Sequence, residues 1–315
     1  MEKNVTSSYL NMIVLLDNFY NIIPQSNLLW RLFRFSVRTM TNIYAKYFMS
    51  IHSKRNDVTH NTIIVSLTSF PARINHLWIT IATLLNQTYE DVHIVLWLSR
   101  DQFPNEIGSL PKSLVRLTSK GLNIRFVDDD LRPHKKYFYA FKEWPDHCIV
   151  TVDDDIINNP HLVEALVKMH ELYPDCVICN RGINIEKNAY VSWKHTDDKQ
   201  AGVPSHRIMP TGIGGVLYPP GCYDNKHIFD IDAIKRTCLN GDDLWLNFMT
   251  RSKGTKVVLT GFKTGLVTLL TSQSSALCNN NVGQNMNDVQ IAAINDWANK
   301  ELGMSFYDKI EMNGN

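Results

Sequence analysis

One stretch constrains the fold of this chain more than any other. The run Ile149-Val150-Thr151-Val152 leads directly into Asp153-Asp154-Asp155. The first four residues are apolar or β-branched, as in a buried strand, and a helical pattern follows over residues 162–173. In an open α/β sheet, ligands bind at the carboxyl ends of the strands, so we expect these acids to face a crevice. The sequence therefore predicts an α/β fold with a carboxylate cluster at a strand end.

Three adjacent carboxylates repel one another, and a nearby cation relieves that repulsion. Mg²⁺ and Mn²⁺ suit such a place, because they accept one or two carboxylates and take their other ligands from phosphate oxygens and water. We interpret Asp153-Asp154-Asp155 as a site for a metal-bound diphosphate. The alternative is an acidic turn that caps the next helix. The buried strand ahead of the acids favours the site.

Length and composition limit the classes of protein to consider. A chain of 315 residues with 44% hydrophobic content can form one large domain or two closely packed ones. A net charge of +1 argues against a nucleic-acid partner. The six cysteines lack the spacing of a disulfide framework, so we interpret them as core residues of a cytoplasmic protein. The sequence shows neither a membrane span nor a signal peptide.

The first 60 residues are expected to be helical, with an aromatic-rich pattern over residues 28–51. Residues 28–55 contain no acid and six basic residues: Arg31, Arg34, Arg38, Lys46, Lys54 and Arg55. A helix of this kind can lie on an anionic membrane surface, which gives a peripheral membrane contact through residues 28–55. The alternative is a helix that packs on the rest of the chain or on a partner.

The rest of the chain alternates strands and helices. Strands are expected over 62–68, 92–98, 123–127 and 148–152. Helices are expected over 75–86, around 114–120 and over 135–144. This alternation predicts a parallel sheet with helices on both faces.

Four of these segments together carry a resemblance: 63–70 (IIVSLTSF), 84–89 (LLNQTY), 94–96 (IVL) and the acidic triplet. In this order they resemble the nucleotide-binding half of GT-A glycosyltransferases, in particular the family 2-like bacterial enzymes, from about Thr62 to Trp245. The resemblance implies a GT-A fold, which is Rossmann-like with a mostly parallel central sheet. It divides the chain into a helical extension (1–60), a nucleotide-sugar-binding half (61–160) and an acceptor-binding, catalytic half (161–315).

The resemblance also implies a nucleotide-diphosphate sugar lying across the strand ends. Asp155, together with Asp153, would hold Mn²⁺ or Mg²⁺. The residues expected at the donor are Thr68, Arg73, Asp128, Lys135, Lys136, Asp153 and Asp154. Arg73 and the two lysines would add positive charge around the diphosphate.

Two later stretches complete the expected site. The glycine-rich segment 210–221 places Gly214 and Gly215 at the sugar and acceptor, although a plain Gly-Pro turn explains the same composition. Asp243 matches the catalytic base of inverting members, with Asp242 orienting it; a helix-capping role is the alternative for either. No histidine follows His227, which leaves a third metal ligand open. Residues 279–288 form either a lid or a surface loop.

The expected function is metal-dependent transfer of a sugar from a nucleotide-diphosphate sugar to a hydroxyl of a glycan or lipid-linked acceptor. Inversion is expected, with a role in bacterial surface polysaccharide or lipopolysaccharide synthesis. A nucleotidyltransferase is one alternative, although the segment 69–73 lacks the glycine-rich loop expected there. A non-catalytic carbohydrate-binding or scaffold subunit is the other.

Overall fold

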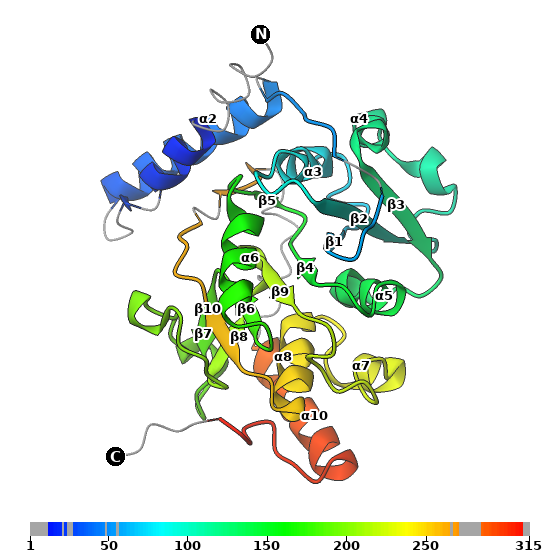
Figure 1. Ribbon diagram of the computed structural model, residues 1–315, viewed down its shortest axis with the longest axis vertical. Coiled ribbons are helices and arrows are strands. Elements are labelled where there is room, and N and C mark those ends of the chain that lie inside the picture. Colours follow the sequence, from blue (N-terminus) through cyan, green and yellow to red (C-terminus); the bar gives the residue numbers. More distant parts are fainter. Residues whose placement is uncertain are drawn as a thin grey trace.

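The structure is a computed structural model that describes residues 12–20, 22–23, 28–47, 49–54, 57–264, 267–270 and 285–310 (Figure 1). Its helices are α2 (Leu28–Tyr47), α3 (Leu77–Leu85), α4 (Lys112–Val115), α5 (Lys135–Glu143), α6 (Leu162–Leu172), α7 (Ile231–Thr237), α8 (Asp242–Lys253) and α10 (Met286–Glu301). Its strands are β1 (Ile63–Thr68), β2 (Val92–Ser99), β3 (Leu122–Val127), β4 (Ile149–Thr151), β5 (Ile156–Ile157), β6 (Val177–Cys179), β7 (Gly182–Asn184), β8 (Ile208–Pro210), β9 (Val216–Tyr218), β10 (Val257–Leu259) and β11 (Val267–Thr268). Residues 12–20 are helical as well.

Seven of the strands form one sheet in the order β10-β6-β9-β4-β1-β2-β3. Strands β1 to β4 are mutually parallel where they pair, and β6 is parallel to β10. Strand β9 is antiparallel to both of its neighbours, β4 and β6. Six strands therefore point the same way, and their carboxyl ends meet along one edge of the sheet.

Two hydrophobic clusters cover the two faces of this sheet. Side chains on a strand alternate between faces, so Ile64 joins one cluster while its neighbours Ile63 and Val65 join the other. Helices α5, α7, α8 and α10 pack with Ile64, and α3, α4 and α6 pack with Ile63 and Val65. The predicted α/β fold, with a mostly parallel sheet and helices on both faces, is confirmed.

The structure adds an element that the sequence did not predict directly after the acids. There the chain forms the two-residue strand β5 before α6 begins. This strand pairs with β11 in antiparallel register, Ile157 opposite Val267 and Ile156 opposite Thr268. Of the predicted lid over 279–288, residues up to 284 lie outside the part of the chain that the structure describes.

The Asn86-Gln87-Thr88 run fixes the segment that follows the acids. Gln87 donates from Nε2 to the carbonyl of Asn159 (2.9 Å), and its Oε1 accepts from the amide of Val163 (3.0 Å). The amide of Thr88 donates to the carbonyl of Pro160 (2.9 Å). These buried bonds hold residues 158–163 against the end of α3, so the run has a structural role that its sequence alone does not reveal.

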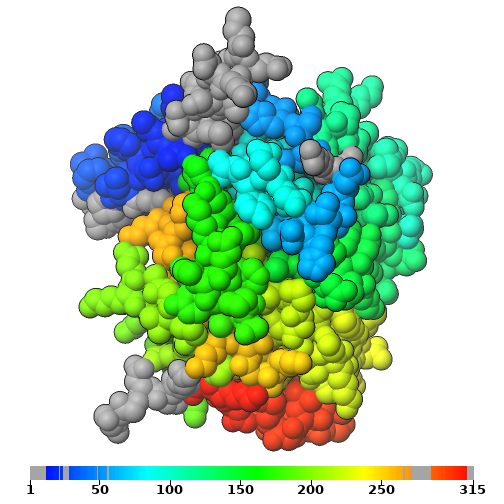
Figure 2. Space-filling view, viewed as in Figure 1, coloured from blue at the N-terminus to red at the C-terminus, as the bar shows by residue number. Residues whose placement is uncertain are grey.

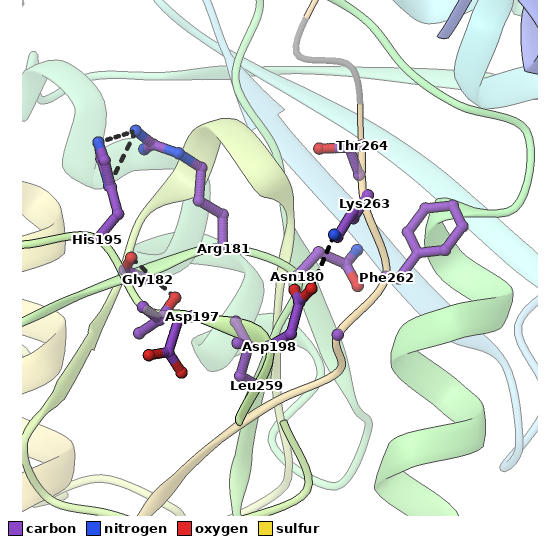
Figure 3. Close-up of a pocket in the computed structure, with 12 residues that line it drawn as sticks. Asn180, Arg181, Gly182, His195, Asp197, Asp198, Leu259, Phe262, Lys263 and Thr264 are labelled. Carbon is purple, nitrogen blue, oxygen red and sulfur yellow. Dashed lines mark hydrogen bonds and ion pairs between the residues drawn. The ribbon is translucent and has the colours of Figure 1, made fainter. Parts of the chain in front are cut away.

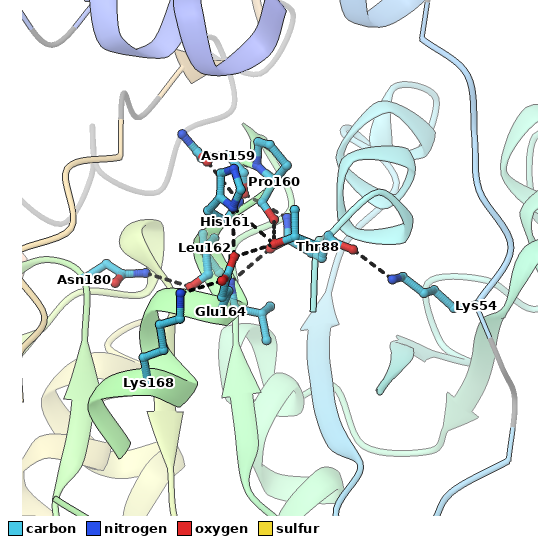
Figure 4. Close-up of polar contacts among 11 residues, drawn as sticks. Lys54, Thr88, Asn159, Pro160, His161, Leu162, Glu164, Lys168 and Asn180 are labelled. Atoms are coloured by element: carbon cyan, nitrogen blue, oxygen red, sulfur yellow. Dashed lines mark hydrogen bonds and ion pairs between the residues drawn. The ribbon is translucent and has the colours of Figure 1, made fainter. Parts of the chain in front are cut away.

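A second set of polar contacts surrounds Thr88 (Figure 4). The hydroxyl of Thr88 donates to Glu164 Oε2 (2.9 Å), and Lys168 pairs with Glu164 Oε1 (2.6 Å). The hydrogen bonds from Lys168, His161 and Thr88 lower the pKa of Glu164 to about 2. Lys54 donates to the carbonyls of Gln87 (2.8 Å) and Tyr89, which ties the N-terminal extension to the same loop.

Helix α2 is also bonded to the strand pair beside the acids. Arg38 donates from Nε to the carbonyl of Thr268 and from Nη2 to that of Leu269, both at 3.0 Å. Asn42 bonds Thr268 through Nδ2 (3.2 Å) and the amide of Leu270 through Oδ1 (3.1 Å). The amide of Leu269 in turn donates to the carbonyl of Asp155 (2.8 Å). The extension is therefore connected through β11 to the acidic triplet.

We predict that Arg38→Met lowers the free energy of unfolding by about 2 kcal/mol, because two carbonyls lose a charged donor. Urea denaturation measures this change. Arg31 is the matched control, since it lies on the same helix but is exposed. Arg31→Met is expected to change stability by less than about 0.5 kcal/mol, as for most surface substitutions. Equal effects of the two substitutions would contradict a structural role for the Arg38 bonds.

Candidate active site

The three acids after β4 do not share one environment. The side chains of Asp153 and Asp155 are 33% and 13% exposed, whereas that of Asp154 is 7% exposed. Asp153 is thus the most exposed of the three, and Asp154 and Asp155 are both largely covered.

Arg73 holds two of these acids from the loop after β1. Its Nη1 pairs with Asp154 Oδ1, and its Nη2 lies 3.2 Å from Asp155 Oδ2. The hydroxyl of Ser69 donates to Asp154 Oδ2 (2.6 Å). Burial acts to lower the pKa of Arg73, but the charges of Asp154 and Asp155 outweigh it and raise that pKa. Burial raises the pKa of Asp154, which Arg73 and Ser69 partly offset.

Lys136 joins the acidic triplet to a second acidic pair. It lies in the first turn of α5, and its side chain is only 5% exposed. Its Nζ lies 2.9 Å from Asp153 Oδ1 and 2.7 Å from Asp242 Oδ2. Burial acts to lower the pKa of Lys136, but Asp153, Asp242 and Asp243 raise it well above its ordinary value. Lys136 is therefore a fixed positive charge between two segments that lie far apart in the sequence.

Asp242 and Asp243 begin α8, where the helix dipole favours negative charge. Asp242 is buried, while Asp243 keeps partial exposure. The amide of Gly212 donates to Asp243 Oδ2 (3.1 Å). Burial and the neighbouring charge of Asp242 raise the pKa of Asp243 from 3.8 to about 7, against the opposing charge of Lys136. Asp243 is thus an oriented carboxyl that titrates near neutral pH.

The glycine that faces this cluster is Gly212. A Cβ at Gly212 would lie 2.7 Å from Lys136 Nζ and 2.8 Å from Asp153 Oδ1. Gly214 and Gly215, expected at the sugar and acceptor, are required by packing: a Cβ at Gly214 would lie 2.7 Å from Arg181 Cβ, and Gly215 has φ +78° beside Leu162. Gly212 is therefore the glycine of this segment whose backbone lies against the carboxylates, and the expected sugar and acceptor role of Gly214 and Gly215 stays a prediction.

Three other predicted residues pair with groups outside the carboxylate cluster, which consists of the acidic triplet and the pair Asp242-Asp243. Thr68 donates to the carbonyl of Trp97 (2.7 Å), and Lys135 is buried with its Nζ 2.5 Å from Asp130 Oδ1. Asp128 is 87% exposed and pairs with Arg100 (2.7 Å). It follows β3, which lies three strands from β4, roughly 14 Å away at the usual strand spacing.

The residues of the cluster are suited to a divalent cation only in part. Carboxylate oxygens such as those of Asp153 and Asp155 are the ligands that Mg²⁺ and Mn²⁺ prefer. In the described part of the chain, no group of three or more His, Cys, Asp or Glu side chains is placed to hold a metal. An ion held by two carboxylates would therefore need phosphate oxygens and water to complete its coordination.

A pocket of about 220 Å³ opens beyond the ends of β6 and β10 (Figure 3). Arg181, which packs against Gly214, lines it together with His195, Asp198 and Lys263. Arg181 lies within hydrogen-bonding distance of His195 (3.2 Å) and donates to Thr211 (3.0 Å). Lys263 pairs with Asp198 at 2.8 Å. The pocket has polar walls of both charges, and none of the five carboxylates of the cluster lines it.

Two residues of the cluster are not among those that the sequence indicated. Ser69 is the first residue after β1, the position where parallel strands present side chains to a site. Gly212 belongs to the glycine-rich segment, but composition does not say which glycine meets the carboxylates. In the sequence, Ser69 could have been indicated by its position directly after a predicted strand, and Gly212 by its place in the glycine-rich segment.

Comparison with known proteins shows likeness only at a general level. No protein-family model matches the chain, and no curated protein matches it. Among solved structures it is similar to TarS 1-349 of S. aureus, at 11% identity over 78% of this chain and 73% of that one, with a TM-score of 0.44.

It is also similar to the mannosyltransferase PcManGT from Pyrobaculum calidifontis, solved in complex with GDP-Man and Mn²⁺, at 10% identity over 71% and 62% of the two chains (TM-score 0.40). An apo UDP-glucose pyrophosphorylase matches at 10% identity over 68% and 97% (TM-score 0.37). With identities this low and TM-scores below 0.5, these likenesses assign neither substrate nor reaction.

We predict that Arg73→Met lowers the free energy of unfolding by about 3–5 kcal/mol, because it leaves the buried Asp154 without its cation. Chemical denaturation at neutral pH measures the change. The double variant Arg73→Met/Asp154→Leu removes both charges and is expected to recover most of the loss. A double variant no more stable than Arg73→Met would show that the pair is not what stabilises this loop.

Proposed function

We propose that this protein is a glycosyltransferase that moves a sugar from a nucleotide-diphosphate sugar to a hydroxyl of a glycan or lipid-linked acceptor. One observation carries the proposal: Lys136 contacts both Asp153 and Asp242, so the acidic triplet and the acidic helix start form a single cluster. The sequence resemblance to GT-A enzymes gives these two groups the donor and base roles of one reaction. We further propose that the reaction is inverting, takes place in the cytoplasm and serves bacterial surface polysaccharide or lipopolysaccharide synthesis.

The donor side of the site is assigned to the strand ends. Arg73 and Lys136 supply positive charge next to the acids, which supports binding of a diphosphate at this edge. Asp155 and Asp153 would hold Mn²⁺ or Mg²⁺, and the bound ion would neutralise charge on the departing diphosphate. Thr68, Asp128, Lys135 and Asp154 remain proposed donor residues, and we propose Asp128 for the nucleoside end because it follows the edge strand β3.

Asp243 is assigned as the general base. In a single displacement, the acceptor oxygen forms its bond to the anomeric carbon while the bond to the nucleoside diphosphate breaks. The acceptor's hydroxyl proton passes to a carboxylate as the new bond forms. The amide of Gly212 orients Asp243, and a pKa of about 7 suits proton transfer at neutral pH. Burial raises that pKa first, and the charge of Asp242 raises it further.

The acceptor is assigned to the side of Gly214 and Gly215. Arg181 separates these glycines from the polar pocket at the ends of β6 and β10. The donors and acceptors on the pocket walls would form hydrogen bonds with the hydroxyls of an acceptor. We propose that Asp243, which accepts from Gly212 of the same glycine-rich segment, acts between the donor and acceptor sides.

The proposal predicts that one donor in a panel of UDP-, GDP-, CMP- and dTDP-sugars is hydrolysed or transferred when Mn²⁺ is present. Chelation with EDTA and the variant Asp155→Ala are each expected to lower the rate about 100-fold, since each removes charge stabilisation of the leaving group. Product analysis by mass spectrometry distinguishes the classes of enzyme. Cleavage of the donor only when pyrophosphate is added, to give a nucleoside triphosphate and a sugar 1-phosphate, would indicate a nucleotidyltransferase. Binding without turnover would indicate a carbohydrate-binding subunit.

The pH dependence tests the base. A raised carboxyl pKa means that the protonated form persists to higher pH, so kcat/KM is expected to rise as pH increases through about 7. Asp242→Asn removes a charge that raises this pKa, so the rising limb is expected to move to lower pH. Asp243→Asn is expected to lower kcat by about 10²–10⁴ and to abolish the limb. If the rise of kcat/KM with pH were unchanged in Asp242→Asn, the base would be another residue. The same would follow if this rise persisted in Asp243→Asn.

A further inference from the structure

The N-terminal extension carries most of the exposed hydrophobic surface of the described chain. Of eighteen large hydrophobic side chains that are exposed in the described residues, thirteen lie between residues 12 and 47. We call these thirteen the outer apolar patch: Met12, Leu15, Phe19, Ile22, Leu28, Leu29, Trp30, Leu32, Phe33, Phe35, Met40, Ile43 and Tyr47. Figure 2 shows α2 along one edge of the molecule, in blue. Surfaces of this extent mark binding to a protein or a membrane.

Nine of the thirteen patch residues form two helical rows that touch. In the first helix the exposed residues recur at 12, 15, 19 and 22, and in α2 they recur at 29, 33, 40, 43 and 47. Spacings of three, four or seven residues place side chains on one helix face. The rings of Phe19 and Phe33 pack edge to face, with centroids 6.2 Å apart. The two rows therefore form one continuous surface.

The opposite face of α2 is the one that packs on the protein, and it is largely polar. Its buried residues are Val37, Thr41, Asn42 and Ala45. Arg34 donates to the carbonyls of Tyr20 and Ile23, as Arg38 does to those beside the acids. A surface helix usually turns its apolar face to the core. Here the polar face points inward and the apolar face outward, so folding of this chain leaves the apolar face uncovered in the described structure.

The charge around the patch is of one sign. Arg31 and Lys46 are exposed near the two ends of α2. Asp17, the only acid between residues 12 and 47, is buried and accepts a hydrogen bond from Asn159 (2.7 Å). The exposed part of the extension thus presents hydrophobic and basic side chains and no acid among the described residues.

We propose that the outer apolar patch binds the surface of an anionic lipid bilayer. Its hydrophobic and aromatic side chains would enter the boundary between headgroups and acyl chains, and Arg31 and Lys46 would lie at the level of the anionic headgroups. Among the described residues, no helix has the length and hydropathy to cross a bilayer. The patch therefore gives attachment along the membrane plane.

A second copy of this chain fits the patch less well. In a twofold dimer the same surface faces itself, so each copy would bring its own Arg31 and Lys46 to the interface. The patch offers no acid to pair with them, and like charges at an interface oppose binding. An anionic bilayer supplies the opposite charge, which is why we favour it.

Sedimentation of the full-length protein with vesicles tests the proposal. We expect binding to vesicles of equal parts phosphatidylcholine and phosphatidylglycerol, and weaker binding to phosphatidylcholine alone. The variant Leu29→Gln/Phe33→Gln/Ile43→Gln is expected to lower the partition coefficient at least tenfold. The variant Arg31→Glu/Lys46→Glu is expected to lose binding to the anionic vesicles mainly.

A matched control replaces three exposed hydrophobic residues outside the patch: Leu172→Gln/Val191→Gln/Val289→Gln. This control is expected to bind as the wild type does, and thermal unfolding confirms that each variant is folded. A wild type that stays in the supernatant with both vesicle types, or a patch variant that binds as the wild type does, overturns the proposal. A lipid-free dimer that only the patch variant dissociates would assign the patch to a second copy.

The proposal does not depend on the proposed function. Vesicle binding is measured without donor or acceptor. The protein can therefore bind vesicles even if it turns over none of the sugar nucleotides. Conversely, sugar transfer to a water-soluble acceptor by a protein that ignores vesicles would leave the enzyme assignment intact and remove the membrane surface.

Discussion

The burial of one lysine organises the site. The ammonium group of Lys136 has almost no solvent contact, so it depends on carboxylates to replace water. It finds them on two segments, at the end of β4 and at the start of α8. Two further hydrogen bonds fix the backbone of this lysine. The hydroxyl of Ser66 on β1 donates to the carbonyl of Lys136, and the indole of Trp97 donates to the Ser66 hydroxyl (2.9 Å). One buried charge thus links the central strands to a helix of the second half of the chain.

The balance of charge around this lysine explains the chemistry of the cluster. Five carboxyl groups (Asp153, Asp154, Asp155, Asp242 and Asp243) meet two cations, Lys136 and Arg73. Such an excess is relieved either by binding a cation or by keeping a proton. The raised pKa of Asp243 is the second of these responses. The same excess makes the edge attractive to a divalent ion once a diphosphate can share its coordination.

Features set by local sequence pattern were predictable, and features set by distant pairing were not. The strand into Asp153 and the helix after it over residues 162–173 follow from local pattern, and both stand close to where we expected them. That Gln87 holds the backbone after the acids depends on a partner some seventy residues away. The choice among Gly212, Gly214 and Gly215 depends on which loop packs against which side chain, and that is decided only in the folded chain.

The orientation of α2 is another feature that the sequence alone does not determine. Its hydrophobic residues predict a helix correctly, but periodicity does not say which face turns inward. The bonds of Arg38 and Asn42 to β11 decide it, because a buried polar face is stable when carbonyls accept from it.

The same bonds determine what can be concluded from a variant that lacks the N-terminal extension. A chain that begins at the first strand would leave the carbonyls of Thr268 and Leu269 without their donors from α2, and Leu269 is the residue that bonds the backbone of Asp155. A change in behaviour on truncation would therefore report damage to the carboxylate cluster as readily as loss of the outer apolar patch. Separating the two requires changes confined to the outward face of α2, with the helix itself kept in place.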